Sequence, residues 1–190
     1  SYIKYKLSSI LTMLTELIED KNFLSDLQKD LIKNEVLGSS FPFYWEDSAA
    51  YENDGHGYLV HTILARPEGR KQDDNRINSD YYEFFLSLFD TFCNKHNIEY
   101  REVLRMAINL TMNNGTPVSP THTDHDFPHN QFLLYFNDSE TSLTTIYDRD
   151  KTILHEIKAE QFKGVAFPDN QHSVTMPTEG RRVVGVYTFR

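Results

Sequence analysis

An alternation of apolar and polar residues begins near Glu102 and continues to Met112. Every second side chain is apolar: Leu104, Met106, Ile108, Leu110 and Met112. The positions between them are mixed: Arg105, Ala107, Asn109 and Thr111. Alternate side chains leave a strand on opposite faces, so this period of two predicts a strand. We expect its apolar face to pack against helices and its mixed face to line a polar pocket.

Short strand-like runs separated by turn residues follow as far as the C-terminus. We expect strands at about 119–125, 131–137, 142–147, 152–158, 163–167, 172–176 and 181–189. Many short strands at this spacing are typical of a sandwich or a barrel. No internal repeat or linker interrupts them, so the 190 residues are predicted to form one domain.

The N-terminal part of the chain has a helical period instead. Residues 3–20 place apolar side chains along one stripe, which predicts an amphipathic helix. Asn22 can cap a second helix that extends to about Asn34. The inward-facing side chains of this second helix are expected to be Leu24, Leu27 and Leu31.

A third helix is predicted from Asp80 onward. Its buried stripe consists of Tyr81, Phe85, Leu88, Phe89 and Phe92. Four segments precede it: the aromatic run Phe41–Trp45, a polar loop at 46–57, a strand at Tyr58–Leu64 and a charged loop at Arg66–Arg76. We expect the aromatic run to be an edge strand rather than a substrate-facing wall, and His61 to be a hydrogen-bonded structural histidine. The charged loop is either simply solvated or a lid over a site.

The composition narrows the class of protein. Aromatic residues make up 13% of the chain, which is a globular composition. The net charge of −9 disfavours nucleic-acid binding, because an acidic surface repels phosphate. The single cysteine, Cys93, excludes an intrachain disulfide and fits a cytoplasmic location. No run approaches the length of a membrane span, so no membrane partner is expected, and the oligomeric state stays open.

Two histidines and one aspartate have the spacing of a metal site. His122 and Asp124 lie two apart in a predicted strand, so both side chains leave the same face and can reach one ion. His172 begins another short strand and would complete a set of two histidines and one carboxylate. This set keeps open coordination positions and suits non-haem Fe(II). A zinc site that combines His122 with the nearby His125 and His129 is the alternative.

Arg182 follows His172 by ten residues. Together with His122-Thr-Asp124 and the strand Leu134–Asn137, this pattern resembles the Fe(II)/2-oxoglutarate-dependent dioxygenases, nearest to their prolyl-4-hydroxylase-like branch. The resemblance covers roughly residues 100–190. It implies an α+β, mainly β fold, in which N-terminal helices pack against one sheet of a double-stranded β-helix, a cupin-like jelly roll. Residues 1–100 would supply helical support and substrate-side loops, and residues 101–190 the catalytic core.

The resemblance also implies a reaction. His122, Asp124 and His172 would hold Fe(II), with 2-oxoglutarate and O2 as cosubstrates and ascorbate as an auxiliary reductant. Oxidative decarboxylation to succinate and CO2 would accompany hydroxylation of an unactivated C–H bond. The expected substrate is a small molecule or a peptide, with a prolyl residue or a proline-like amino acid as the leading class.

Three further residues receive cofactor-binding roles by the same resemblance. Arg182 would bind the distal carboxylate of 2-oxoglutarate, because a guanidinium makes a two-pronged contact with a carboxylate. Arg181 is the competitor, and the two side chains point to opposite faces of their strand. Tyr135 matches a tyrosine whose hydroxyl touches the same carboxylate. Asn109 matches an asparagine of AlkB-like relatives, although Thr111 replaces the tyrosine that follows it there.

Two other functions stay open. An AlkB-like nucleobase demethylase would use the same ligand set, but the charge of −9 speaks against it. A metal-binding jelly roll could also bind a ligand without turnover. The intact ligand set and Arg182 favour an enzyme over this binding module.

Overall fold

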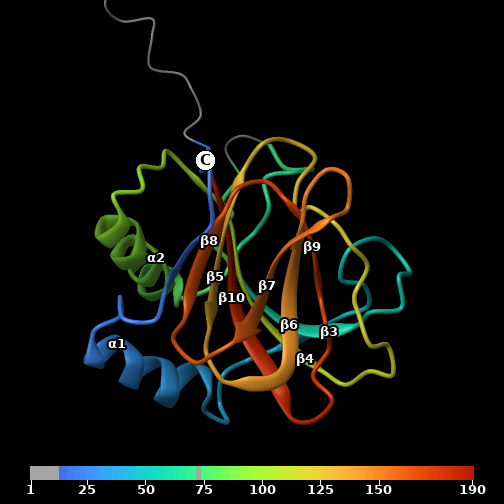
Figure 1. Ribbon diagram of the computed structural model, residues 1–190. Coiled ribbons are helices and arrows are strands. Elements are labelled where there is room, and N and C mark those ends of the chain that lie inside the picture. Colours follow the sequence, from blue (N-terminus) through green and yellow to red (C-terminus); the bar gives the residue numbers. More distant parts are fainter. Residues whose placement is uncertain (1–12, 72–73) are drawn as a thin grey trace, which may run out of the picture.

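The computed structural model describes residues 13–71 and 74–190, whose strands form two antiparallel sheets (Figure 1). The elements in chain order are β1 (Ile18–Asp20), α1 (Asp26–Leu31), the π-helical turn η1 (Ile32–Val36), β2 (Tyr44–Glu46), β3 (Tyr58–Leu64), α2 (Tyr82–His96), β4 (Val103–Met112), β5 (Asn130–Tyr135), β6 (Ser139–Tyr147), β7 (Ile153–Ala159), β8 (Gly164–Phe167), β9 (Gln171–Val174) and β10 (Arg181–Phe189). The larger sheet has the order β1-β8-β5-β10-β4-β3-β2, and the smaller sheet has the order β7-β6-β9. The described part of the chain is therefore mainly β with two α-helices.

The two faces of the larger sheet bury different clusters of side chains. Phe132 of β5 packs against Phe89 of α2, with ring centroids 5.5 Å apart. The next residue, Leu133, belongs to a second cluster together with Ile146 of β6. Helices thus cover one face of the larger sheet, and the smaller sheet covers the other.

Strand β4 confirms the predicted alternation except at its last residue, because Met112 is 47% exposed. Met106 and Ile108 are fully buried in the cluster on the helix side. Arg105 and Asn109 point the other way and line a cavity between the two sheets. The polar face of β4 therefore lines the cavity between the two sheets.

The helix predicted over residues 3–20 is wrong for its described part, and residues 3–12 lie outside the described residues. Residues 18–20 form β1, which pairs antiparallel with residues 164–166 of β8. Leu17 packs against the cluster between the sheets and Ile18 against the cluster on the helix side. Consecutive side chains leave on opposite faces because the segment binds the free edge of β8, where main-chain partners are available.

The second predicted helix begins later than expected. Its N-cap is Ser25 rather than Asn22, because Ser25 and Gln28 form a capping box. The Ser25 hydroxyl accepts from the Gln28 backbone N–H at 3.3 Å, and the Gln28 side chain accepts from the Ser25 backbone N–H at 2.9 Å. Leu24 is buried as predicted. The prediction that Leu27 faces inward is wrong, because its side chain is 70% exposed.

The third helix and the edge strand are confirmed. The predicted stripe of α2 is buried at Phe85, Leu88, Phe89 and Phe92, and Tyr81 packs against it. The aromatic run contributes the buried Phe41 and then β2, which lies at the edge of the larger sheet beside β3.

The segment at 119–125 is not the strand that the sequence predicts. Val118 and His122 instead form isolated bridges with Thr175 and His172, alongside β9. Pro120 lacks the N–H that a continuous ladder requires at its position. The other six predicted strands after β4 are present as β5 to β10, with bounds shifted by a few residues.

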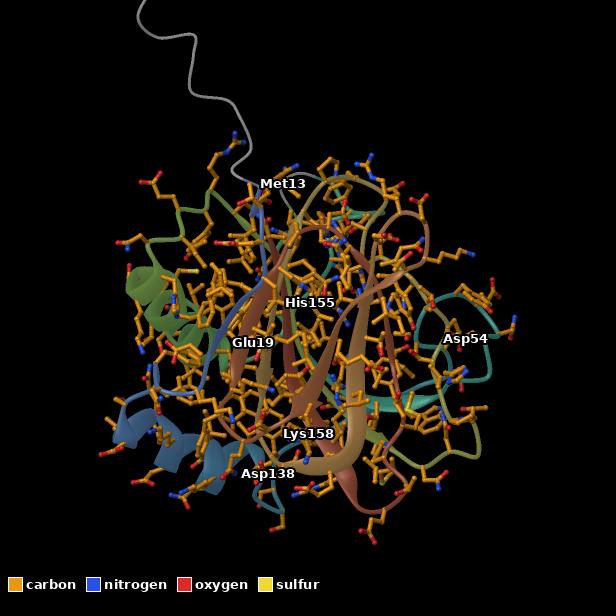
Figure 2. All side chains as sticks on the ribbon, in the orientation of Figure 1. Met13, Glu19, Asp54, Asp138, His155 and Lys158 are labelled. Atoms are coloured by element: carbon orange, nitrogen blue, oxygen red, sulfur yellow. The ribbon has the colours of Figure 1, made fainter. Side chains whose placement is uncertain are left out.

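Strand β7, at the edge of the smaller sheet, is largely exposed to solvent. His155 and Lys158 are two of its exposed residues (Figure 2). Neither helix of the described chain has the length and apolar character needed to cross a membrane.

Candidate active site

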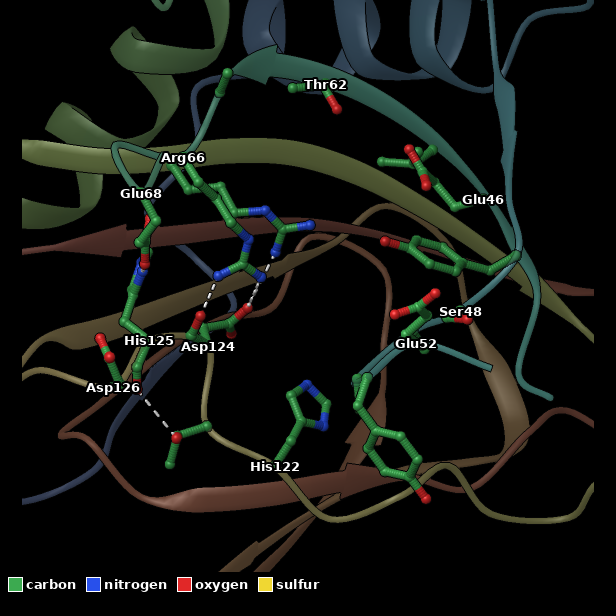
Figure 3. Close-up of a pocket in the computed structure, with 18 of the residues that line it drawn as sticks. Glu46, Ser48, Glu52, Thr62, Arg66, Glu68, His122, Asp124, His125 and Asp126 are labelled. Carbon is green, nitrogen blue, oxygen red and sulfur yellow. Dashed lines mark hydrogen bonds and ion pairs between the residues drawn. The ribbon is translucent and has the colours of Figure 1, made fainter. Parts of the chain in front are cut away.

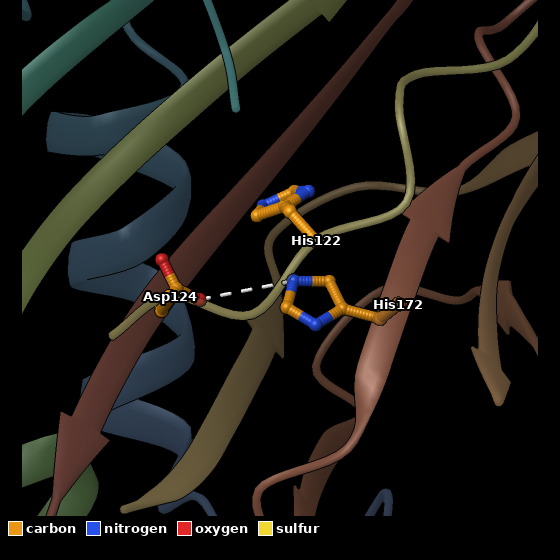
Figure 4. A group of neighbouring side chains, drawn as sticks. All are labelled: His122, Asp124 and His172. Atoms are coloured by element: carbon orange, nitrogen blue, oxygen red, sulfur yellow. Dashed lines mark ion pairs between the residues drawn. The ribbon is translucent and has the colours of Figure 1, made fainter. Parts of the chain in front are cut away.

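His122, Asp124 and His172 converge on one point between the sheets (Figure 4). The segment after β4 supplies the first two side chains, and β9 supplies the third. One potential ligand atom from each residue lies within 4.8 Å of the others. His172 Nε2 is 3.7 Å from Asp124 Oδ2. The structure therefore brings together the three residues that the sequence singles out.

Backbone hydrogen bonds hold the two histidines side by side. The His122 N–H donates to the His172 carbonyl at 3.0 Å, and the His172 N–H donates to the His122 carbonyl at 2.9 Å. This reciprocal pair fixes the separation of the two Cα atoms. The imidazole centroids lie 4.6 Å apart.

The outer ring nitrogen of each histidine has a backbone partner. Nδ1 of His122 lies 3.0 Å from the Pro120 carbonyl, and Nδ1 of His172 lies 3.3 Å from the Asn170 carbonyl. A carbonyl accepts only, so each Nδ1 carries the proton and each Nε2 keeps its lone pair. Burial lowers the pKa of His172 to about 4, against the opposing effect of Asp124. The His172 imidazole is therefore neutral at pH 7, as a metal ligand must be.

The Asp124 carboxylate is buried but surrounded by donors. Oδ1 accepts from Arg66 Nη2 at 2.7 Å and from Arg105 Nη1 at 3.1 Å, and Oδ2 accepts from Gln131 Nε2 at 2.6 Å. Burial alone would raise the pKa of the Asp124 carboxyl, but the positive charges of Arg105 and Arg66 outweigh it and hold the pKa far below its usual range. The carboxylate is thus ionised at any physiological pH.

A cavity between the sheets extends from this trio toward β10. Arg182 is 3% exposed, its Nη2 donates to Thr144 Oγ1 at 3.0 Å, and its guanidinium lies 5.3 Å from the Tyr135 ring centroid. The Tyr135 hydroxyl donates to the same Thr144 oxygen at 2.8 Å. Asn109 Oδ1, Thr111 Oγ1 and Arg182 Nε are buried without a hydrogen-bond partner among the described residues. These polar atoms belong to residues that line one cavity, so they favour a polar ligand there.

Arg181 lies elsewhere. Its side chain is on the exposed face of β10, and its Nη2 donates to the Leu37 carbonyl at 3.2 Å. Of the two candidate arginines, only Arg182 lines the cavity beside the histidines.

An outer pocket of about 790 Å³ opens on the other side of His122 and Asp124 (Figure 3). The loop 46–52 forms one wall, and the beginning of the charged loop, with Arg66, forms another. Arg105 lines both this pocket and the inner cavity. The trio therefore lies between two spaces, one enclosed by the sheets and one open to solvent.

The neighbouring histidines have other partners. His125 pairs through Nδ1 with Glu68 and through Nε2 with Thr188 Oγ1 at 2.7 Å. His129 Nδ1 lies 2.9 Å from the Phe127 carbonyl. Within 13–71 and 74–190, neither histidine joins a group of three potential metal ligands, so the alternative zinc site lacks support. His61 is confirmed as a structural histidine, bonded to the Pro42 carbonyl at 2.8 Å and to Ser79 Oγ at 2.7 Å.

Solved structures with a similar fold share little sequence with this chain. An oxidoreductase of the 2OG-Fe(II) oxygenase family from Burkholderia pseudomallei superposes with a TM-score of 0.71 at 14% identity, over 91% of this chain and 84% of that one. This is the fold of the 2-oxoglutarate-dependent Fe(II) oxygenases. A prolyl hydroxylase from Trichoplax adhaerens, in complex with a peptide of hypoxia inducible factor, gives 0.63 at 14% identity over 91% and 82%. A prolyl-4-hydroxylase from Pseudomonas putida gives 0.59 at 15% identity over 92% and 91%. No family model and no curated protein matches the chain.

Sequence reasoning missed the residues that surround Asp124 in this fold. Arg66 belongs to the loop that was expected to be solvated or to act as a lid, and Gln131 lies in a strand with no distinguishing pattern. Arg105 was assigned only to the polar face of its strand. The one available signal was an arginine in the middle of an otherwise apolar run, since a buried cation needs a partner.

Proposed function

We propose that the protein is an Fe(II)- and 2-oxoglutarate-dependent dioxygenase that hydroxylates an unactivated C–H bond, with His122, Asp124 and His172 as the iron ligands. The observation that carries this proposal is the trio itself, located beside a cavity that is lined by Arg182. The similarity in fold to 2OG-Fe(II) oxygenases supports it. The donor set of two imidazoles and one carboxylate suits Fe(II) and leaves positions for other ligands.

The residues present fit the metal. Both histidines offer Nε2 lone pairs, because their Nδ1 atoms are engaged by carbonyls. Arg66 and Arg105 occupy Oδ1 of Asp124, while Oδ2 faces His172. A carboxylate has about four lone-pair sites, so Gln131 leaves room for a metal on Oδ2.

The residues present also fit 2-oxoglutarate. Arg182 would bind its distal carboxylate, with the unpaired Nε as an additional donor. Tyr135 would act mainly by positioning, because its hydroxyl holds Thr144 Oγ1 beside the guanidinium. Asn109 contributes a buried amide to the same cavity. These three roles are part of the proposal.

When bound, iron and 2-oxoglutarate supply the activation of O2 that couples decarboxylation to oxidation of the substrate. The chain's own contribution is to hold the ligand trio rigidly, to bind the cosubstrate in a buried cavity and to limit access of water. The substrate would enter from the outer pocket, on the solvent side of His122 and Asp124.

We further infer that the two sheets form a double-stranded β-helix. Consecutive segments cross repeatedly between them: β4, β5, β8 and β10 belong to the larger sheet, whereas β6, β7 and β9 belong to the smaller sheet, next to which lies the segment 118–122. This crossing pattern supports a jelly roll, with the trio at the junction of 118–122 and β9.

For the substrate, we propose a prolyl residue or a proline-like amino acid. The support is the similarity in fold to a prolyl-4-hydroxylase and to a prolyl hydroxylase in complex with a peptide.

An anaerobic titration tests the proposed function. Adding Fe(II) and 2-oxoglutarate to the metal-free protein should produce a visible charge-transfer band, and the Asp124→Ala variant should not produce it. Asp126→Ala, an exposed carboxylate nearby, serves as the matched control and should keep the band. Absence of the band in the unmodified protein, or its persistence in Asp124→Ala, would contradict the proposal.

A further inference from the structure

We propose that the outer pocket binds a free amino acid, with its carboxylate at Arg105 and Arg66 and its cationic group at Glu46 and Glu52. This inference rests on the proposed function and narrows its substrate class. It selects a free, dipolar amino acid over a residue inside a peptide chain.

The arginine end of the pocket places two guanidiniums beside one carboxylate oxygen. Arg105 is 8% exposed, and among the described residues its guanidinium makes one hydrogen bond, from Nη1 to Asp124 Oδ1 at 3.1 Å. Arg66 lies on the same carboxylate oxygen, so two guanidiniums share one anion. Glu68 and Asp126 also line the pocket, but the Glu68 carboxylate is bonded to His125 and Asp126 is exposed. Guanidinium donors that Asp124 does not engage can bind an anion in the pocket, and a carboxylate has the geometry that a guanidinium prefers.

The position of Arg105 connects these guanidiniums with the candidate metal site. Arg105 lines both the outer pocket and the inner cavity, next to His122 and Asp124. An anionic group held there would bring the attached carbon atoms close to the metal ligands. Arg105 is thus a specificity-determining residue in this proposal.

The opposite wall of the pocket is acidic. Glu46 and Glu52 line it, are exposed, and form no ion pair among the described residues. Figure 3 shows both carboxylates across the pocket from Arg66, with His122 between the two walls. They would bind an ammonium or another cationic group of the same occupant.

The loop that carries Glu52 is held in place by Asp54. The Asp54 carboxylate accepts from the backbone N–H of Ala50 at 2.7 Å, of Ala49 at 3.0 Å and of His56 at 2.8 Å. The acidic wall is therefore presented by an ordered loop, which reduces the entropic cost of binding.

An occupant with a negative and a positive end satisfies both walls. A free amino acid carries both charges on its α-groups. A residue inside a peptide has neutral amides at both positions, and a nucleic-acid phosphate would be repelled by Glu46 and Glu52.

The test measures binding without turnover. Protein loaded with Mn(II) and 2-oxoglutarate is titrated by calorimetry with each of the proteinogenic L-amino acids and with the N-acetyl, C-amide and doubly capped form of each. At least one free amino acid should bind, and each cap should weaken it by tenfold or more. The proposal is overturned if no free amino acid binds, or if a doubly capped form binds as tightly as the free one.

Two sets of variants test which wall of the pocket binds which charged group of the amino acid. Because Arg105 also contacts Asp124, Arg105→Gln is measured at saturating Mn(II) and 2-oxoglutarate, where it should weaken binding of the free amino acid at least tenfold and abolish the penalty of the C-amide cap. Glu46→Gln combined with Glu52→Gln should abolish the penalty of the cap at the cationic end, and both positions are exposed, so the fold is retained. Arg181→Gln is the matched control. If the penalty of the C-amide cap persists in Arg105→Gln under these conditions, Arg105 does not bind the substrate carboxylate and the proposal fails.

The proposed function and the proposed substrate class can fail independently. Absence of the charge-transfer band with Fe(II) and 2-oxoglutarate would contradict the proposed function. A normal band together with a negative calorimetric panel would remove only the substrate class.

Discussion

Arg66 contacts Asp124 at two points: Nη1 donates to its backbone carbonyl, and Nη2 donates to its carboxylate Oδ1 at 2.7 Å. The first contact fixes the main chain of the ligand residue, and the second fixes its side chain. A residue of the charged loop therefore orients the only carboxylate of the proposed metal site.

Removing this contact should weaken the metal site. We expect Arg66→Ala to reduce Fe(II) affinity by about 10- to 100-fold, because residues that orient a ligand have effects of this size. Anaerobic calorimetry with Fe(II) measures it. Arg70→Ala is the matched control: it lines the same pocket, and the structure gives it no contact with Asp124. Equal affinities for the two variants would show that the loop does not orient the ligand.

Asp124 should also stabilise the metal-free protein. Its side chain is 4% exposed and pairs with Arg66 and Arg105. Asp124→Ala leaves these guanidiniums without their anion, so it should lower the free energy of unfolding by about 3 kcal/mol or more. Urea unfolding in the presence of a chelator measures this loss. Asp126→Ala should change stability by less than about 0.5 kcal/mol. A metal-free Asp124→Ala protein as stable as the original would mean that the arginine pairs contribute nothing.

The two adjacent arginines of β10 offer a matched pair. Arg182→Gln should raise the dissociation constant for 2-oxoglutarate by about 10- to 100-fold, because a charge-assisted hydrogen bond contributes roughly 1.5–3 kcal/mol. Arg181→Gln should leave it unchanged, since that side chain contacts Leu37 on the opposite face. Titration of the charge-transfer band compares them directly. A reversed order would move the cosubstrate out of the cavity lined by Arg182.

Asp20 should make stability depend on pH in the acidic range. Burial raises its pKa, but hydrogen bonds from Lys95, from the Asn22 N–H and from His96 more than offset this and lower the pKa below 3.8. The ionised form is thus favoured in the folded state. Its stabilising contribution is complete above the unfolded pKa of 3.8 and is lost as the pH falls through the lower, folded value.

The Asp20→Asn variant should lose this dependence. Urea unfolding at several pH values from about 6 down to about 3 should give a flatter stability profile below the unfolded pKa than in the original protein. Asp150→Asn, an exposed position, should retain the original profile. Parallel profiles for Asp20→Asn and the original protein would exclude Asp20 as the source of the dependence.

The pairing of His122 with Asp124 could be predicted because its signal is local, whereas His172 lies far beyond them in the chain and was identified by the ligand set it would complete and by the family resemblance. His122 and Asp124 are two residues apart, and the chemistry of their side chains limits what they can do together. The alternation in β4 likewise predicts which side chains face the helices, and the structure confirms it at Met106 and Ile108.

The partners of Asp124 could not be predicted, because they depend on where remote segments meet. Arg66 leaves the end of β3, and Gln131 lies in β5, so neither has a sequence spacing that points to Asp124. The failure at residues 13–20 has a similar cause. The same apolar spacing can follow a helix or the edge of a sheet, and the free edge of β8 decides the outcome.

The reciprocal backbone pair between His122 and His172 has a consequence for how the chain can vary in length. Because neighbouring strand residues face opposite ways, inserting or deleting a single residue between Asn170 and His172 would turn one imidazole toward the outer surface. Natural variants should therefore tolerate gaps in the reversal at 148–152, which joins β6 to β7, while this short stretch keeps a fixed length.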